Sequence, residues 1–107
     1  MTDLSSLPSS VFAPLVGQTV VFTRADGVEM TAEVVKVVEN PRGTPPDAPR
    51  IAFSVILHVA EPCEHTGGSY SMAHPDPEVG ELAAMTLSRI ANNTLNRDYA
   101  RFELAFN

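Results

Sequence analysis

Residues 19–38 read TVVFTRADGVEMTAEVVKVV, and this stretch gives the first clear indication of a β-fold. Its first part, residues 19–23, is β-branched and aromatic, the composition that a half-buried strand favours. Asp26-Gly27 follows, and an Asp-Gly pair between two apolar runs is a strong hairpin signal because both positions tolerate positive φ. Apolar residues then occupy every second position from Val28 to Val34. The stretch therefore predicts two antiparallel strands joined by a tight turn.

The alternation slips by one residue where Val34 and Val35 stand side by side, after which Val35 and Val37 continue the apolar set. Such a slip is typical of a β-bulge or a bend, which a strand shows where it passes from one side of a small barrel or sandwich to the other. Burial of both faces at this point explains the pattern equally well.

Three further stretches predict strands. Residues 51–59 are small or apolar on both faces, which favours a central strand, and residues 69–74 alternate more briefly. Residues 99–106 alternate over the last strand of the chain. The expected inner faces of these three stretches are Ile51, Phe53, Val55, Leu57 and Val59; Tyr70, Met72 and His74; and Phe102, Leu104 and Phe106.

Residues 82–90 fit two structures. Leu82, Met85 and Arg89 lie at near-helical spacing, whereas Ala83, Met85 and Leu87 alternate as in a strand. The intervening residues 39–50, 61–68 and 91–98 are rich in turn-forming residues, and no long helical period alternates with the strands. The sequence therefore predicts an all-β fold, a small antiparallel barrel or sandwich of about six strands.

The composition limits the functional classes. The 107 residues carry a net charge of −6 and one cysteine, which suits one small domain without an internal disulfide. The acidic balance argues against nucleic acid as a partner, and no apolar run approaches the ~20 residues of a membrane span. The start of the chain lacks a secretory signal, so we expect synthesis in the cytoplasm, with incorporation into a virion or extracellular assembly left open. We expect a flexible arm over residues 1–10 and a single β-domain over residues 11–107.

The residues capable of metal or nucleophile chemistry gather in residues 58–74. Glu61, Cys63 and His65 stand at every second position, and zinc accepts all three ligand types. Pro62 interrupts any strand there, and one thiol without a Cys-x-x-Cys pair is a weak zinc signal. There is no Gly-x-Ser-x-Gly elbow and no phosphate-binding loop after Gly67-Gly68. We therefore predict no catalytic, cofactor-binding or metal-binding residues. The alternative is a small-ligand or metal-binding protein or enzyme that uses Cys63, His65 and His74.

Acidic residues without a neighbouring Lys or Arg occupy residues 61–81, namely Glu61, Glu64, Asp76, Glu78 and Glu81. A solvated acidic edge of this kind favours a basic partner surface over a catalytic carboxylate pair. His74 precedes Pro75, where an imidazole can hydrogen-bond loop backbone and fix the turn. We expect this structural role for His74.

Several short motifs follow one another along the chain. They are Val16-Gly17-Gln18-Thr19, Phe53-Ser54, Gly68-Ser69-Tyr70, His74-Pro75, Gly80-Glu81-Leu82 and the closing Phe102-Glu103-Leu104-Ala105-Phe106-Asn107. In this order residues 11–107 resemble a family of small bacterial and phage-associated proteins of unknown function. The resemblance implies genes close to tail-collar and tail-fibre-like genes, a strand after the central glycine, and no catalytic residues.

The expected function is a non-enzymatic structural or adaptor β-domain of a phage-tail-like or fibre assembly. Its partners would be proteins, through self-association or contacts with tail and fibre proteins. The strand over residues 99–106 is a candidate for pairing with a neighbour's sheet edge. The Pro-rich residues 39–50 and the arm over residues 1–10 are the other expected contact elements.

Overall fold

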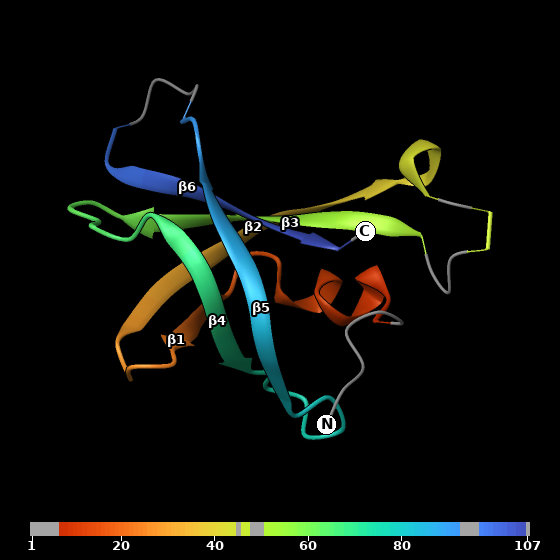
Figure 1. Ribbon diagram of the computed structural model, residues 1–107, viewed down its shortest axis with the longest axis horizontal. Coiled ribbons are helices and arrows are strands. Elements are labelled where there is room, and N and C mark those ends of the chain that lie inside the picture. The colour runs from red at the N-terminus through yellow and green to blue at the C-terminus, as the bar shows by residue number, and fades with distance from the viewer. Residues whose placement is uncertain (1–6, 45, 48–50, 93–96, 107) are drawn as a thin grey trace.

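The computed structural model describes residues 7–44, 46–47, 51–92 and 97–106, and it confirms the all-β fold class (Figure 1). Six antiparallel strands close into a barrel in the order β1-β2-β3-β6-β5-β4, with β4 pairing back to β1. The strands are β1 (Thr19–Arg24), β2 (Glu29–Asn40), β3 (Ala52–Ala60), β4 (Gly67–Ala73), β5 (Glu81–Ile90) and β6 (Tyr99–Phe106). Three short 3₁₀ turns accompany them: η2 (Ser9–Val11), η3 (Ala13–Leu15) and η4 (Pro41–Gly43).

The Asp-Gly hairpin forms as predicted between β1 and β2. Gly27 adopts φ 89°, and its N–H donates to the Arg24 carbonyl at 3.0 Å. The Asp26 carboxylate accepts hydrogen bonds from the Arg24 guanidinium and from the Val28 N–H. These bonds, the one from Arg24 first, hold the pKa of Asp26 below its ordinary value of 3.8. Val28 belongs to this turn and is 40% exposed, so the inward set of β2 begins at Met30 rather than at Val28.

Two bulges set which residues face inward. The register between β2 and β3 shifts between Val34 and Lys36, which confirms the bulge interpretation of the slipped alternation. In the other bulge, Tyr70 pairs with Met85 but Met72 pairs with Leu82, so β5 carries one extra residue. Leu82 and Met85 therefore both point into the core, and their spacing of three is the spacing that also fitted a helix. Residues 81–90 form a strand.

β3 is the central strand that the sequence predicts, because β2 and β6 pair along its two edges. Phe53, Val55, Leu57 and Val59 face the barrel interior. Ile51 was expected on this face, but it precedes β3 and is exposed. Among the described residues the buried side chains are apolar, apart from the hydroxyl of Tyr70, which lies 2.8 Å from His65 Nδ1.

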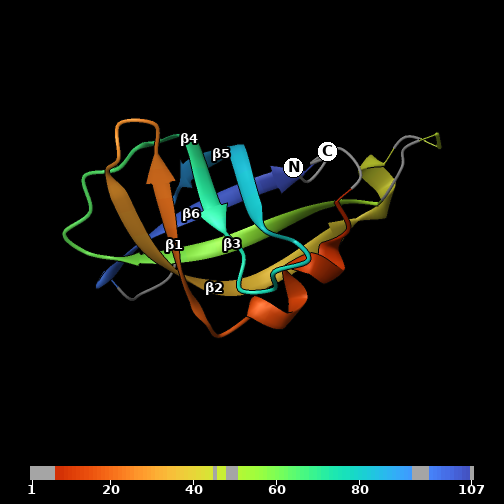
Figure 2. The ribbon, with the colours of Figure 1, turned by 90° about the horizontal axis from the view of Figure 1, so that it is seen from below.

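The N-terminal segment closes one end of the barrel (Figure 2). Phe12 packs against both Phe53 and Phe106, at centroid distances of 6.1 and 5.4 Å, and Leu15 is buried in the same core. Leu7 is only 4% exposed and belongs to the same core. We expected a flexible arm over residues 1–10, but the packed part of the chain already includes Leu7. Residues 1–6 of that expected arm lie outside the described residues.

At the same end, β2 and β3 run on beyond the barrel as an extended hairpin that carries η4 (Figure 1). β1 pairs with β2 only as far as Glu33, so within the described residues 35–40 only β3 is a strand neighbour. The Thr44 hydroxyl donates to the Asn40 carbonyl and accepts from the Ala52 N–H, which ties the hairpin end together. The predicted loop over residues 39–50 thus begins later, after Asn40, and its residues 45 and 48–50 lie outside the described chain.

β6 does not offer the free strand that the sequence suggested. Residues 101–104 pair with β3 on one edge and with β5 on the other. Adding a neighbour's strand there would require the barrel to open. A longer stretch with one strand neighbour lies on β2, in the part that extends beyond β1.

Candidate functional site

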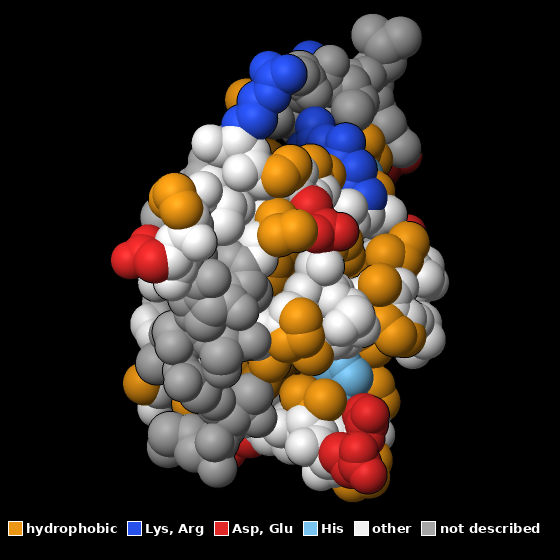
Figure 3. All heavy atoms as spheres, turned by 90° about the vertical axis from the view of Figure 1, so that its right-hand side faces the viewer, with side chains coloured by type: hydrophobic (Ala, Val, Ile, Leu, Met, Phe, Trp, Pro, Cys, Tyr) orange, Lys and Arg blue, Asp and Glu red, His pale blue; other side chains and the backbone are white. Residues whose placement is uncertain are grey.

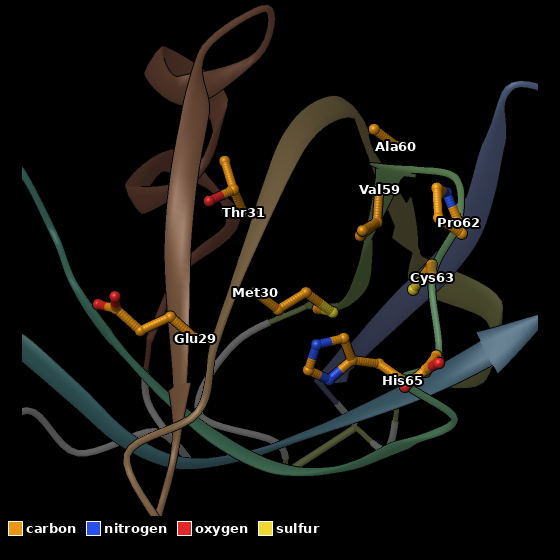
Figure 4. A pocket seen from close by; sticks show the side chains of 9 residues that line it. Glu29, Met30, Thr31, Val59, Ala60, Pro62, Cys63 and His65 are labelled. Atoms are coloured by element: carbon orange, nitrogen blue, oxygen red, sulfur yellow. The ribbon is translucent and has the colours of Figure 1, made fainter.

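Two of the three candidate residues of the alternative hypothesis lie together. Cys63 and His65 belong to the loop between β3 and β4 and line an open hollow of about 500 Å³ at the barrel mouth opposite the N-terminal segment (Figure 4). The Tyr70 hydroxyl lies 2.8 Å from His65 Nδ1, which fixes the ring. Cys63 is partly buried against the core, and its N–H donates to the Glu61 carboxylate.

His74 lies at the other end of the barrel, because the length of β4 separates it from His65. Its Nδ1 accepts the Asp76 N–H, so Nε2 carries the proton and donates to the Val11 carbonyl at 2.8 Å. The ring therefore fastens the N-terminal segment to the turn after β4, a structural contact like the one expected. Within the described part of the chain, no three His, Cys, Asp or Glu side chains come together as metal ligands would.

Arg89 closes the mouth that Cys63 and His65 line. It follows Met85 and Leu87 in the inward phase of β5 and pairs in register with Phe102. Its guanidinium donates to the carbonyls of Cys63 at 2.8 Å and His65 at 3.0 Å. Sequence reasoning missed this role, although a cation at the end of an apolar alternation was the available signal.

Gly67, the first residue of β4, has a packing role beside the same loop. It adopts φ 119°, and a Cβ there would lie 2.6 Å from the Leu87 carbonyl oxygen. Only glycine permits β4 to approach β5 so closely at this point. Gly67 therefore helps to shape the mouth of the barrel.

A polar row crosses the outer surface of the barrel near this mouth. Register places His58 between Glu33 on β2 and Arg101 on β6, and the His58 ring stacks on Tyr99 with centroids 3.7 Å apart. The pKa of His58 lies below its ordinary value of 6.5, chiefly because the ring is withdrawn from water and then because Arg101 is near, while Glu33 opposes both. The sequence places His58 in the stretch capable of metal or nucleophile chemistry, and it did not predict this row.

Two hollows lie on either side of Tyr99. One, of about 470 Å³, is lined by Glu33, Asp98 and His58 among others. The other, of about 210 Å³, is lined by Arg89, Arg97 and Arg101 together with Glu61. The outer surface at this mouth is thus divided by Tyr99 into an acidic and a cationic side.

These features define a class of protein: a small closed antiparallel β-barrel with a filled interior, whose polar groups are available only at its surface. The chain belongs to the family described as a domain of unknown function (DUF6916), whose profile matches residues 7–106. No curated protein and no solved structure matches the chain. Across residues 7–44, 46–47, 51–92 and 97–106, no helix has the length and apolar character needed to cross a bilayer.

Proposed function

We propose that this protein is a non-enzymatic structural or adaptor domain that acts through protein contacts on its outer surface. The filled barrel is the observation that carries the proposal. About eight strands give an interior just wide enough for side chains or one small ligand, and this barrel has six strands and an apolar core. The placement of His74 at the opposite end of the barrel from Cys63 and His65 also favours this proposal over a shared site of the three residues.

The extended β2–β3 hairpin is the surface that best suits such contacts. A sheet edge with one neighbour can accept a strand from another protein. Val38 lies in this part of β2 and is 45% exposed, and Ile51 precedes β3 with 46% exposed. The bulge after Val34 and the charges of Lys36 and Glu39 disfavour indiscriminate pairing, so the edge suits a particular partner. On the end of the molecule that carries this hairpin, hydrophobic side chains are interspersed between basic and acidic ones (Figure 3).

We further propose a phage-tail-like or fibre assembly as the setting. The support is the resemblance to small phage-associated proteins, whose genes look like neighbours of tail-collar and tail-fibre-like genes. A compact domain with a projecting hairpin suits an accessory that bridges larger fibre proteins. The partner in this proposal is a protein that supplies an extended strand to β2.

The test is co-expression with a tail-collar-like or fibre-like protein, followed by size-exclusion chromatography with light scattering. We expect a complex that Val38→Lys abolishes, since a charge at the open edge would meet the incoming strand. Val21→Lys is the matched control, because Val21 is 43% exposed on β1, away from that edge, and we expect it to retain the complex. Equal behaviour of the two variants, or a wild-type protein that binds neither these proteins nor itself, would contradict the proposal.

A further inference from the structure

Three neighbouring strands present a row of side chains on the outer surface of the barrel. Register places Lys36 of β2 opposite Ile56 of β3, and Ile56 opposite Glu103 of β6. Directly opposed residues on antiparallel strands share one face of the sheet. Val55, the residue before Ile56, is fully buried in the core. Because successive residues of a strand point to opposite faces, the row of Lys36, Ile56 and Glu103 faces outward.

The next outward row along the same strands carries no charge. It consists of Val38, Ser54 and Ala105, which also pair in register. Val38 is 45% exposed, and the small side chain of Ala105 is exposed as well. β2, β3 and β6 lie side by side, with β3 in the middle (Figure 2). The two rows together form one surface, which we call the β2–β3–β6 face.

The two charges of this face stand on opposite sides of β3. Lys36 belongs to β2 and Glu103 to β6, so Ile56 lies between them. Neither Lys36 nor Glu103 forms an ion pair or a side-chain hydrogen bond with another described residue. The face therefore carries a positive charge along one side of β3 and a negative charge along the other, and each is available to a partner.

This arrangement is complementary to itself. Most homodimers have two-fold symmetry, in which both copies use the same surface. A two-fold axis parallel to β3, between two stacked sheets, places β2 of one copy over β6 of the other. Lys36 of each copy then lies opposite Glu103 of the other copy. Ile56 lies opposite Ile56 of the other copy, and Val38 lies opposite the small side chain of Ala105.

The other symmetric way of stacking two such faces brings like charges together. An axis perpendicular to β3 in the same plane places β2 over β2, so that Lys36 lies opposite Lys36 and Glu103 opposite Glu103. Opposed like charges suppress such a contact. Stacked sheets lie about 10 Å apart, a distance that two long charged side chains span from both sides. The charges therefore select the axis parallel to β3.

We propose that the β2–β3–β6 face binds the same face of a second copy of this chain, in a two-fold dimer with two Lys36–Glu103 ion pairs. This proposal goes beyond the proposed function, which concerns the edge of β2 and a strand from another protein. Stacking of the two faces leaves the hydrogen-bonding groups at that edge directed sideways, within the plane of the sheet. The dimer therefore still offers the edge to a partner.

The test compares the dimer affinity of four proteins by analytical ultracentrifugation: wild type, Lys36→Glu, Glu103→Lys and the variant that carries both changes. Each single variant should weaken the dimer by about ten-fold or more, because it converts two attractive pairs into two repulsive ones. The double variant should regain the wild-type affinity. An equimolar mixture of the two single variants should form a mixed dimer, because every opposed pair in it again has opposite charges.

Arg42→Glu and Glu81→Lys are the matched controls. They make the same changes of charge in η4 and at the start of β5, outside the β2–β3–β6 face, and should leave the affinity unchanged. A wild-type protein that stays monomeric up to about 1 mM would overturn the proposal. Single variants that dimerise like wild type, or a double variant that does not regain affinity, would overturn it as well. Melting curves identify any variant that fails to fold, and the other single variant then decides the outcome.

The composition offers a second measurement. Lys36 is the only lysine among the 107 residues. In a mixture of ¹⁵N-labelled and unlabelled protein, a carbodiimide should join Lys36 of one copy to Glu103 of the other, which mass spectrometry detects as a peptide pair of mixed isotopes. Cross-links between copies that join Lys36 only to other carboxylates would contradict the proposed axis.

Glu103→Lys also separates this proposal from the proposed function. It changes β6 and leaves the edge of β2 as it is. We expect this variant to lose the dimer and to keep the complex with the protein that supplies a strand. A dimer without any such complex would support the β2–β3–β6 face alone, and a complex without a dimer would support the β2 edge alone.

Discussion

The two ends of the barrel are closed by different means. At one end Phe12 enters from the N-terminal segment and packs on Phe53 and Phe106, whose rings lie 4.7 Å apart. At the other end the contacts are polar: the His65 ring meets the Tyr70 hydroxyl, and Arg89 spans the mouth to two loop carbonyls. Apolar closure removes surface from water, whereas polar closure leaves hollows lined by polar and charged side chains. The comparison indicates that the first end stabilises the fold and that the second end offers the groups for recognition.

The largest expected effect is on the apolar end. Phe12→Ala should lower the free energy of unfolding by about 3 kcal/mol, because the ring is fully buried and its removal leaves a cavity against two other rings. Urea denaturation measures this change. Val16→Ala, in the same segment but exposed, should stay within about 0.5 kcal/mol of wild type. A loss below about 1 kcal/mol for Phe12→Ala would mean that the segment is not part of the barrel core.

A smaller effect is expected at the polar end. Arg89→Ala should cost about 2 kcal/mol, because it removes charged hydrogen bonds to the Cys63 and His65 carbonyls. The loop between β3 and β4 should also exchange its amide protons faster, which hydrogen-exchange measurements detect. The apolar end should keep its protection. Equal loss of protection at both ends would show that the two closures are not independent.

The smallest effect concerns pH. Because the pKa of His58 is below 6.5 in the folded protein, the unfolded chain binds a proton there first as the pH falls. Stability should therefore decrease as the pH falls below about 6.5, and this decrease should end once the pH passes the folded-state pKa. His58→Gln should show a smaller decrease in melting temperature between about pH 7 and about pH 5. An identical decrease in wild type and variant would contradict the burial of His58 beside Arg101.

Much of the fold follows from local patterns. The Asp26-Gly27 turn, the slip at Val34 and the alternation of β6 each depend on neighbours in sequence, so the sequence predicts them correctly. The spacing of Leu82 and Met85 fitted both a helix and a strand. The bulge in β5 that explains this spacing is defined by the register with β4, which the sequence of β5 alone does not give.

The site was harder to predict because it depends on contacts distant in sequence. Cys63 and His65 are near in sequence and meet at one mouth, but His74 is carried to the other end by β4. Arg97 and Arg101 lie close along the chain, yet only the β3–β4 loop and β5 bring Glu61 and Arg89 to them. The periodicity of a single strand does not indicate that residues from different strands and loops lie together.

A native mass spectrum of the purified protein, with metal analysis of the same sample, distinguishes a protein that acts through its surface from one that acts through a bound group. The claim is that the filled barrel acts through its surface and not through a bound cofactor. It predicts a mass that equals the polypeptide or a whole-number assembly of it, with no stoichiometric metal or tightly bound small molecule. A stoichiometric metal or ligand that disappears in Cys63→Ser or His65→Ala would contradict the claim and would assign the function to the Cys63 and His65 hollow.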